Sequence, residues 1–518
     1  MLYLSFIYHM HQPYYKDLLT KEAELPWVRL HGIKDYQDMV LILKDFPKIK
    51  LTFNLVPSLL EQINDYTQSN LKDKFYTLSY KAPQELTCEE KKFIIDNFFH
   101  TNLRWGVSVF PRYYELYLKR QNKQDFNAQD ILDLQVWFNL AWYDPSYRKN
   151  IPQLNDLIKK ARFFNAQEKN FVLDKQMDIL KEIIPTYKNF KEKNQIEIIT
   201  SPYYHPILPL LYHTKTAKEA NPQTALPKKI FSFPQDALAQ SREAKVLYKN
   251  CFGDFQQGLW PSEQAVSQHI VDFFIAEGIN WIITDEGILF KSLKKKRRNA
   301  ELIYQPHFIK TEQGSLNIIF RDRNLSDLIS FVYYQWEPKD AVNDFLNHLK
   351  NIHNAYPDKN PLVCVAMDGE NAWEYYKNDG WDFLSLLYQK ISESDFIHTV
   401  TISDYLKNFP AQSPIKRLAC GSWIFANLNK WIGAPLKNLA WEYLALAREK
   451  LEEVKSQLSP SQLNLGLKQI YILEGSDWFW WANENNADFD RLFLRHLFNF
   501  YNLIGEPLPA YLKGKTSL

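Results

Sequence analysis

Two carboxyl groups each end a short, largely apolar run and stand where they could act on a substrate. Glu263 ends the run 258–263 (GLWPSE), in which a tryptophan and a rigid proline precede the carboxylate. Asp368 ends the run 362–368 (LVCVAMD), and Gly369 then permits a sharp turn. A strand this apolar is expected to be buried on both faces and to carry Asp368 into a partly desolvated place. Desolvation raises a carboxyl pKa, as a general acid requires.

Both carboxyls also have a structural interpretation. Glu263 stands just ahead of a helix expected over 265–277, where the helix dipole favours a negative charge. Asp368 could cap the helix that follows its strand. Glu370 is a rival for the acid role, or the like charge that raises the pKa of Asp368.

Polar and aromatic residues after other expected strands could bind a sugar. The run 9–13 (HMHQP) places two imidazoles on one face, which suits hydroxyl recognition, metal ligation or simple bonding to the backbone. Aromatic rings stack on the C–H faces of sugars, and the three tryptophans within 478–481 cannot all face one core. We expect substrate contacts from His9, His11, Gln12, His205, Trp260, Asp285, Trp423, Asp477 and Trp478.

Together these groups are the ones that glycoside cleavage uses. One carboxylate attacks the anomeric carbon, while the other protonates the departing oxygen and then activates water. Their separation in the sequence does not matter, because strand ends converge in space.

Apolar or alternating runs predict the strands that would position these residues, at 2–8, 49–55, 196–200, 279–284, 316–320 and 362–367. Helical periodicity lies between them, for example over 265–277 and 340–353. This alternation predicts an α/β fold with a largely parallel sheet, open or closed into a barrel. Residues from about 60 to 190 are predicted to form a mostly helical insertion. After 410 we expect helices, including 440–457 and 488–501.

Composition excludes several classes of protein. The formal net charge of +2 lacks the basic excess of a nucleic-acid binder, and the basic run 294–298 is interpreted as a solvated loop. No apolar run is long enough for a membrane span, and the N-terminus reads as a strand, so a cytoplasmic location is expected. The four cysteines are widely spaced and predict neither a disulfide framework nor a zinc ribbon.

Five segments in order resemble the motifs of glycoside hydrolase family 57, whose members act on α-glucans: 9–13, 194–205, 260–263, 367–371 and 474–481. The resemblance implies that Glu263 is the nucleophile, that Asp368 is the acid/base, and that the mechanism is retaining. It also implies an incomplete (β/α)7 barrel over 1–408 with the helical insertion, and a C-terminal helical domain over 409–518 that closes the cleft. The second motif departs from the family pattern, with Asn194 where glycine is common, but asparagine tolerates left-handed backbone.

The resemblance favours an α-amylase or amylopullulanase that cleaves starch-like α-glucans. The alternatives are a 4-α-glucanotransferase that uses the same carboxyls, a metal-dependent polysaccharide deacetylase with a histidine site, and a non-catalytic glucan-binding protein. We expect an α-glucan as partner and no nucleic acid or membrane. No cofactor or catalytic metal is expected. A structural Ca²⁺ and the oligomeric state are left open.

Overall fold

The computed structural model describes residues 1–255, 257–295, 297–357, 359–516 and 518. All six expected strands are present, with shifted ends: β1 (Leu2–Met10), β2 (Leu51–Leu55), β3 (Ile196–Ile199), β5 (Trp281–Asp285), β7 (Gly314–Arg321) and β8 (Leu362–Asp368). Four further short strands were not predicted: β4 (Gly258–Leu259), β6 (His307–Thr311), β9 (Ile397–Thr399) and β10 (Ser413–Pro414). Most residues of β1, β2, β3, β5 and β8 are buried, which explains their near-continuous apolar sequences.

The strands form two five-stranded sheets. One has the order β3-β2-β1-β8, with β9 also paired to β1, and the other has the order β10-β6-β7-β5-β4. All pairs are parallel except β6 with β7. The sheets meet where Thr200 pairs with Leu259, and where the Asp322 N–H donates to the Cys364 carbonyl at 2.8 Å. The first contact brings the end of β4 beside the end of β3, and the second brings the end of β7 beside β8.

Helices between the strands cover the sheets. They include α13 (Pro234–Phe252), α18 (Pro338–Ala355), α19 (Trp381–Ser392) and α20 (Ile402–Asn408). The expected helix 340–353 is confirmed as α18, but the one expected over 265–277 is mostly wrong. Val266 instead pairs with Gly421, and α14 covers only Val271–Ala276.

The insertion is helical, as predicted, and most of it has its own hydrophobic core. It comprises α3 (Pro57–Gln68), α4 (Lys74–Tyr80), α5 (Cys88–Asn97), α6 (Pro111–Gln121), α7 (Ala128–Ala141), α8 (Pro145–Asn150), α9 (Pro152–Lys160) and α10 (Ala166–Glu192). Phe75, Phe98 and Trp137 belong to the separate core, whereas α3 packs on the core beneath the sheets. The long helix α10 joins the two cores, because Val172 lies in one and Tyr187 in the other.

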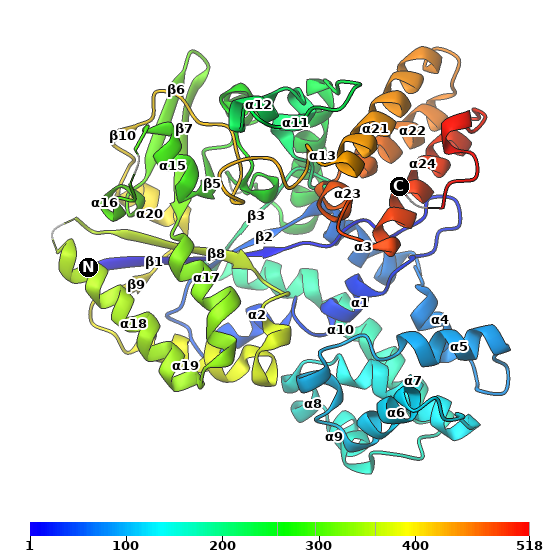
Figure 1. Ribbon diagram of the computed structural model, residues 1–518. Coiled ribbons are helices and arrows are strands. Elements are labelled where there is room, and N and C mark those ends of the chain that lie inside the picture. The colour runs from blue at the N-terminus through cyan, green and yellow to red at the C-terminus, as the bar shows by residue number, and fades with distance from the viewer. Residues whose placement is uncertain (256, 296, 358, 517) are drawn as a thin grey trace.

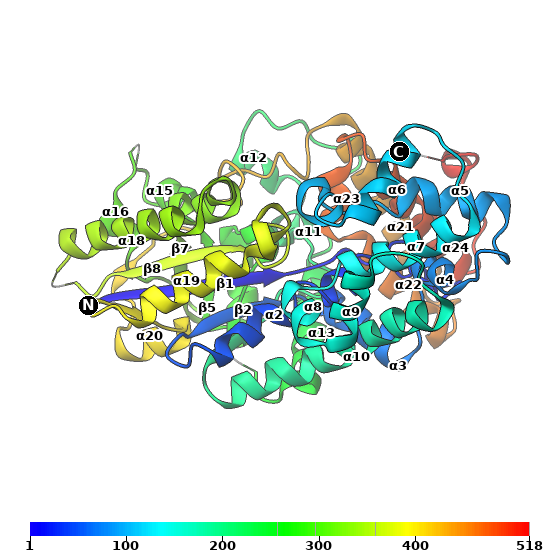
Figure 2. The same ribbon diagram turned by 90° about the horizontal axis from the view of Figure 1, so that it is seen from below.

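The C-terminal helices are α21 (Pro435–Val454), α22 (Pro460–Leu473), α23 (Ser476–Trp481) and α24 (Ala487–Leu503). They share one hydrophobic cluster with the sheets. After the boundary predicted at 409 the chain still contacts the sheets, because β10 pairs with β6 and Gly421 pairs with Val266 before α21 begins. In both Figure 1 and Figure 2, β1 runs from the N-terminus toward the end of the molecule where the insertion and these helices lie.

No helix in the described part of the chain combines the length and apolar character that a bilayer crossing requires.

Candidate active site

A cavity of about 1130 Å³ lies at the C-terminal ends of the parallel strands. Its walls come from the strand ends, from the insertion (His100–Asn102 and Trp142) and from the C-terminal helices. Eight of the predicted site residues line it: His9, His11, Gln12, Trp260, Glu263, Asp368, Trp423 and Asp477. His205 stacks on His11 but does not itself line the cavity. Asp285 and Trp478 do not line the cavity either.

Glu263 has an unusual backbone. It and Gln264 both adopt left-handed conformations, with φ of 57° and 51°, and such values are uncommon outside glycine. They belong to a 3-10 turn (Ser262–Gln264), and the α-helix begins only at Val271. The interpretation of Glu263 as a first-turn helix charge is therefore wrong, because no α-helix starts there. Strained residues of this kind concentrate at functional sites.

Three residues surround the Glu263 carboxylate. The Trp423 indole N–H donates to Oε2 at 2.9 Å, the Ser476 hydroxyl donates to Oε1 at 3.4 Å, and His205 Nδ1 lies 3.9 Å from Oε1. Hydrogen bonds to the charged form of a carboxyl favour that form. The two donors thus stabilise Glu263 as an anion and fix its orientation.

Asp368 ends β8 opposite His9, but its carboxyl is open to the cavity. The Asn371 side-chain amide donates a hydrogen bond to Asp368 Oδ2 at 3.1 Å. The concave surroundings still replace much of its water, and burial raises its pKa, against the opposing effects of Asn371, His11 and Arg321. The expected desolvation is present, although the carboxyl can still be reached from the cavity.

Burial also raises the pKa of Glu263 to about 7, and the charges of Asp477 and Asp368 add to the effect. Two carboxyls with raised pKa values retain a proton close to neutral pH more readily than ordinary ones. The state with one ionised and one protonated carboxyl is the state that glycoside cleavage needs.

Glu370 is almost fully buried, and burial raises its pKa well above the usual range, with the charge of Asp368 contributing. Glu370 therefore retains its proton to a higher pH than an ordinary carboxyl does. The proposed influence of Glu370 on Asp368 is not among the causes of the Asp368 shift, whereas Asp368 does act on Glu370.

The three predicted histidines pack face to face. The His11 and His205 ring centres are 4.2 Å apart, those of His9 and His205 are 4.9 Å apart, and His9 stacks on Trp260 at 4.8 Å. Asn54 and Ser476 bond the Nδ1 atoms of His9 and His205, and Asp477 pairs with His11 Nε2 at 3.0 Å.

Burial lowers the pKa of His9 and of His205 well below the usual range, so both rings are neutral. Within the described part of the chain, His11 Nδ1 and His205 Nε2 have no hydrogen-bond partner. The metal-ligation interpretation has no support in this geometry, because ring faces rather than three nitrogens are directed toward one another. Among the described residues, no group of three or more His, Cys, Asp or Glu is arranged to hold a metal ion.

Two predicted contact residues lie elsewhere. Asp285 is fully buried, caps α15 (Glu286–Ser292) through the Gly287 N–H at 2.8 Å, and pairs with Arg321 and Arg323. Trp478 is buried, and its indole N–H donates to the Ile472 carbonyl at 2.6 Å.

Helix geometry explains the error at Trp478. Adjacent helical residues point in different directions, so Asp477 and Trp478 cannot share a face. Positions three and four residues after Asp477 do share its face, and Trp480 and Trp481 indeed line the cavity. The same periodicity, applied to the sequence, would have identified both.

Arg321 is the main site residue that sequence analysis missed. It ends β7, lines the cavity and is 4% exposed. The rule that strand ends carry functional groups would have found it, since it directly follows the predicted strand 316–320.

Asn194 has φ of 55°, so the left-handed backbone expected in the second motif is present.

Comparisons with known proteins fit this geometry. Residues 5–416 match the family model described as glycosyl hydrolase family 57. A 4-alpha-glucanotransferase of Thermococcus kodakarensis is 21% identical over 286 residues, which are 53% of this chain and 37% of that protein. Alpha-amylase 1 of Dictyoglomus thermophilum is 22% identical over 331 residues, which are 62% of this chain and 40% of that protein. Each match thus spans less than half of the relative's length.

Among solved structures, a GH57-type branching enzyme from Pyrococcus horikoshii has a TM-score of 0.63 at 16% identity. The alignment covers 97% of this chain and 89% of that one, and it shows a shared fold. The family model covers most of the chain, and the five motifs predicted the same family. The chain belongs to glycosyl hydrolase family 57.

Proposed function

We propose that this protein cleaves α-glucosidic bonds of α-glucans by a retaining mechanism, with Glu263 as nucleophile and Asp368 as acid/base. The observation that carries the proposal is the unequal treatment of two carboxyls in one cavity. Glu263 accepts two hydrogen bonds that favour its anion, whereas Asp368 accepts one side-chain hydrogen bond from the described residues and faces the open cavity. An attacking group benefits from fixation, and a proton donor needs access to the leaving oxygen.

In the first step a Glu263 oxygen bonds to the anomeric carbon while the glycosidic C–O bond breaks. The proton of Asp368 passes to the departing oxygen. In the second step Asp368 takes a proton from water, the water oxygen bonds to the anomeric carbon, and the ester to Glu263 breaks. His11 Nδ1 and the rings of Trp260, Trp480 and Trp481 would hold the sugar.

We further infer that the two sheets together form the incomplete barrel expected for the family. The strands β1-β2-β3-β4-β5-β7-β8 follow one another around a ring. The strands β6 and β10 lie outside it, as does β9, which pairs with β1 off the main strand order. In barrels of this kind the catalytic groups stand at the C-terminal strand ends.

A 4-α-glucanotransferase is the second candidate, and the extent of the cavity favours it. The walls continue past the carboxyls to His100, Thr101 and Trp142 of the insertion, which leaves room for an acceptor sugar. A relative with that name matches half of this chain. The deacetylase alternative is disfavoured by the face-to-face histidines, and a non-catalytic binding protein would not need the strained Glu263.

Product analysis on amylose and pullulan separates these candidates. If the protein is a hydrolase, the wild type should release new reducing ends and Glu263→Gln should release none. Redistributed chain lengths without new reducing ends would identify a transferase. A folded wild-type protein that acts on neither glucan would contradict the proposed substrate class, and the products from pullulan would show whether α-1,6 bonds are cleaved.

A further inference from the structure

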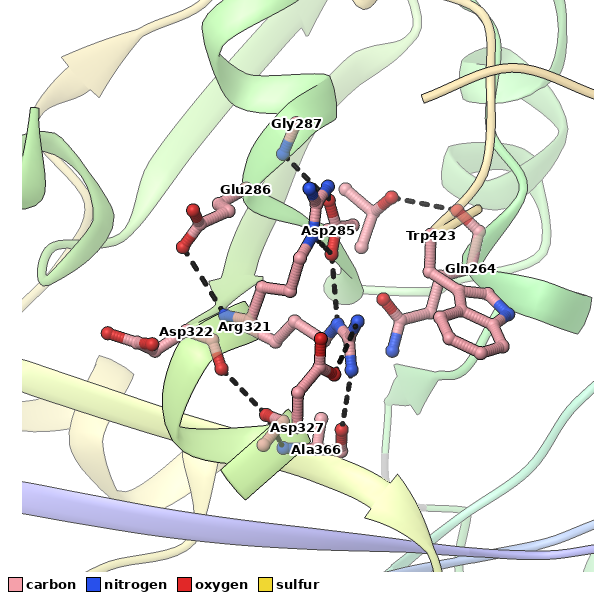
Figure 3. Close-up of polar contacts among 12 residues, drawn as sticks. Gln264, Asp285, Glu286, Gly287, Arg321, Asp322, Asp327, Ala366 and Trp423 are labelled. Atoms are coloured by element: carbon pink, nitrogen blue, oxygen red, sulfur yellow. Dashed lines mark hydrogen bonds and ion pairs between the residues drawn. The ribbon is translucent and has the colours of Figure 1, made fainter. Parts of the chain in front are cut away.

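Arg321 links a fully buried carboxylate to the aromatic residue that holds Glu263 (Figure 3). Its Nε donates to Asp285 Oδ2 at 2.9 Å, and its Nη1 donates to the Ala366 carbonyl at 3.3 Å. The guanidinium carbon lies 5.2 Å from the centre of the Trp423 ring. This distance is typical of a cation–π contact.

Asp285 is well suited to anchor this arrangement. Its side chain is 0% exposed, and it accepts hydrogen bonds from the Gly287 N–H, from Arg321 and from Arg323. A buried carboxylate satisfied in this way has one orientation, because turning it would leave a charge unpaired. Asp285 therefore fixes the guanidinium rather than the sugar.

Trp423 contacts the nucleophile residue at two points. Its indole N–H donates to Glu263 Oε2 at 2.9 Å, and its backbone N–H donates to the Glu263 carbonyl at 3.4 Å. It lies in a segment without helix or strand, so regular backbone pairing does not fix its ring. Its ring packs against Arg321 and lies nearly parallel to Trp480, with ring centres 6.2 Å apart.

We propose that Arg321 is a positioning residue for the nucleophile: Asp285 fixes the guanidinium, the guanidinium fixes the Trp423 ring, and the ring presents its N–H to Glu263. This inference rests on the proposed function, because it takes Glu263 to be the attacking group. Arginine suits the role since its planar fork can bind a carboxylate and stack on a ring at once, which lysine cannot reproduce.

The charge of Arg321 also acts on the acid/base residue. It lowers the pKa of Asp368, as His11 does, against the larger effect of burial. The charge of Asp368 in turn raises the pKa of Glu263 and of Glu370. Arg321 itself faces Asp285, Asp327 at 3.5 Å and the Cys364 thiol.

The test compares Arg321→Gln, Arg321→Lys and Trp423→Phe on maltooligosaccharides, with pH profiles of kcat/KM and melting curves. Arg323→Gln is the matched control, because Arg323 pairs with the same Asp285 but does not line the cavity. We expect Arg321→Gln to lower kcat about tenfold with little change in KM, the effect of a lost cation–π contact and a loosened hydrogen bond. Arg323→Gln should stay within about twofold of wild type, because it leaves the contact with Trp423 in place.

The pH profiles separate positioning from general structure. Without the Trp423 donor the Glu263 anion is less stable and its pKa rises, so the acid limb moves to higher pH in Trp423→Phe and in both Arg321 variants. Without the Arg321 charge the pKa of Asp368 also rises, so the alkaline limb moves up in Arg321→Gln. In Arg321→Lys the charge is kept and the alkaline limb stays.

A double-mutant cycle completes the test. If Arg321 acts through Trp423, the combined Arg321→Gln/Trp423→Phe variant should lose less activity than the product of the two single losses. Additive losses, or folded Arg321 variants with wild-type profiles, would overturn the inference; if Arg321→Gln is too unstable to assay, Arg321→Lys carries the same cycle. Activity that persists in Glu263→Gln would instead overturn the proposed function, so the two failures can be told apart.

Discussion

The two sides of the cavity each carry a carboxyl group, but they place it in different surroundings. On one side Glu263 sits on left-handed backbone, bonded by Trp423 and Ser476 and bordered by His205. On the other side Asp368 ends a regular strand and has Asn371 as its side-chain partner. One carboxyl is clamped, and the other is open to the cavity.

This difference follows from what each side is built of. Asp368 is positioned by β8, whose backbone pairing with β1 continues as far as Asp368 itself. Glu263 follows the two-residue strand β4, so a short ladder positions it, and residues from the C-terminal segment supply the rest. The non-helical segment that carries Trp423 and the helix α23 that carries Ser476 thus complete the Glu263 side, so its contacts depend on distant parts of the chain.

We expect the largest effects on activity from variants that remove one of the two carboxyls. Glu263→Gln should lower kcat on the order of 10³-fold or more with every substrate, because the covalent step is lost. Asp368→Asn should be equally damaging with maltooligosaccharides, but a maltosyl fluoride should restore its first step, since fluoride departs without a proton. Steady-state assays with both substrates measure this. Equal recovery of both variants with the fluoride would remove the distinction between the two sides.

Removing one hydrogen bond to Glu263 should have a smaller effect than removing a carboxyl. Trp423→Phe removes a hydrogen bond to a charged group and should lower kcat/KM at pH 7 about tenfold. Burial raises the pKa of Glu263 to about 7, and its proposed role as nucleophile requires the anion, so activity should fall as the pH drops through that value. Loss of the donor raises this pKa further and moves the acid limb to higher pH. A limb that stays in place in a folded variant would show that Trp423 does not act on Glu263.

The two faces of α23 offer a third test. Trp481→Ala should raise KM on the order of fivefold with little change in melting temperature, because Trp481 lines the cavity. Trp478→Phe should lower the free energy of unfolding by about 1–3 kcal/mol and leave KM unchanged, since its buried N–H bond to Ile472 is lost. The reverse pattern would show that the sugar lies on the other face of the helix.

Glu370→Gln should have the smallest effect, within about threefold of wild-type kcat. Burial raises the pKa of Glu370 and so favours its neutral acid form, and the amide is nearly isosteric with that form. A pH profile that loses its alkaline limb in this variant would make Glu370, rather than Asp368, the proton donor.

The elements of the fold followed from the sequence where local pattern decides. Apolar runs predicted β1, β2, β3, β5, β7 and β8, and helical periodicity predicted α18 and the insertion. The pattern failed over 265–277, where the segment pairs with Gly421 from the distant C-terminal part, a contact that no local pattern encodes.

The site was predictable to the same extent. Strand ends predicted His9 and Asp368, because a strand's direction fixes where its last residue lies. Glu263 follows β4, a strand that was not predicted, and it was identified from the run 258–263 and the family resemblance. Strand ends misled at Asp285, because the adjacent Arg321 and Arg323 occupy its carboxylate, and that pairing depends on how β5 and β7 align. Trp480 and Trp481 lie three and four residues after Asp477, so helical spacing predicts them as cavity residues, but Trp478 was predicted instead.

Glu263 is proposed to form a covalent bond with the sugar, and this bond can be trapped. Asp368→Asn incubated with a maltosyl fluoride should form the glycosyl-enzyme quickly and release it slowly, because no base activates water. Mass spectrometry of the digested protein should then find one added maltosyl group on the peptide that contains Glu263. An adduct on another residue, or turnover of the fluoride with no adduct while Glu263→Gln remains equally active, would contradict the account.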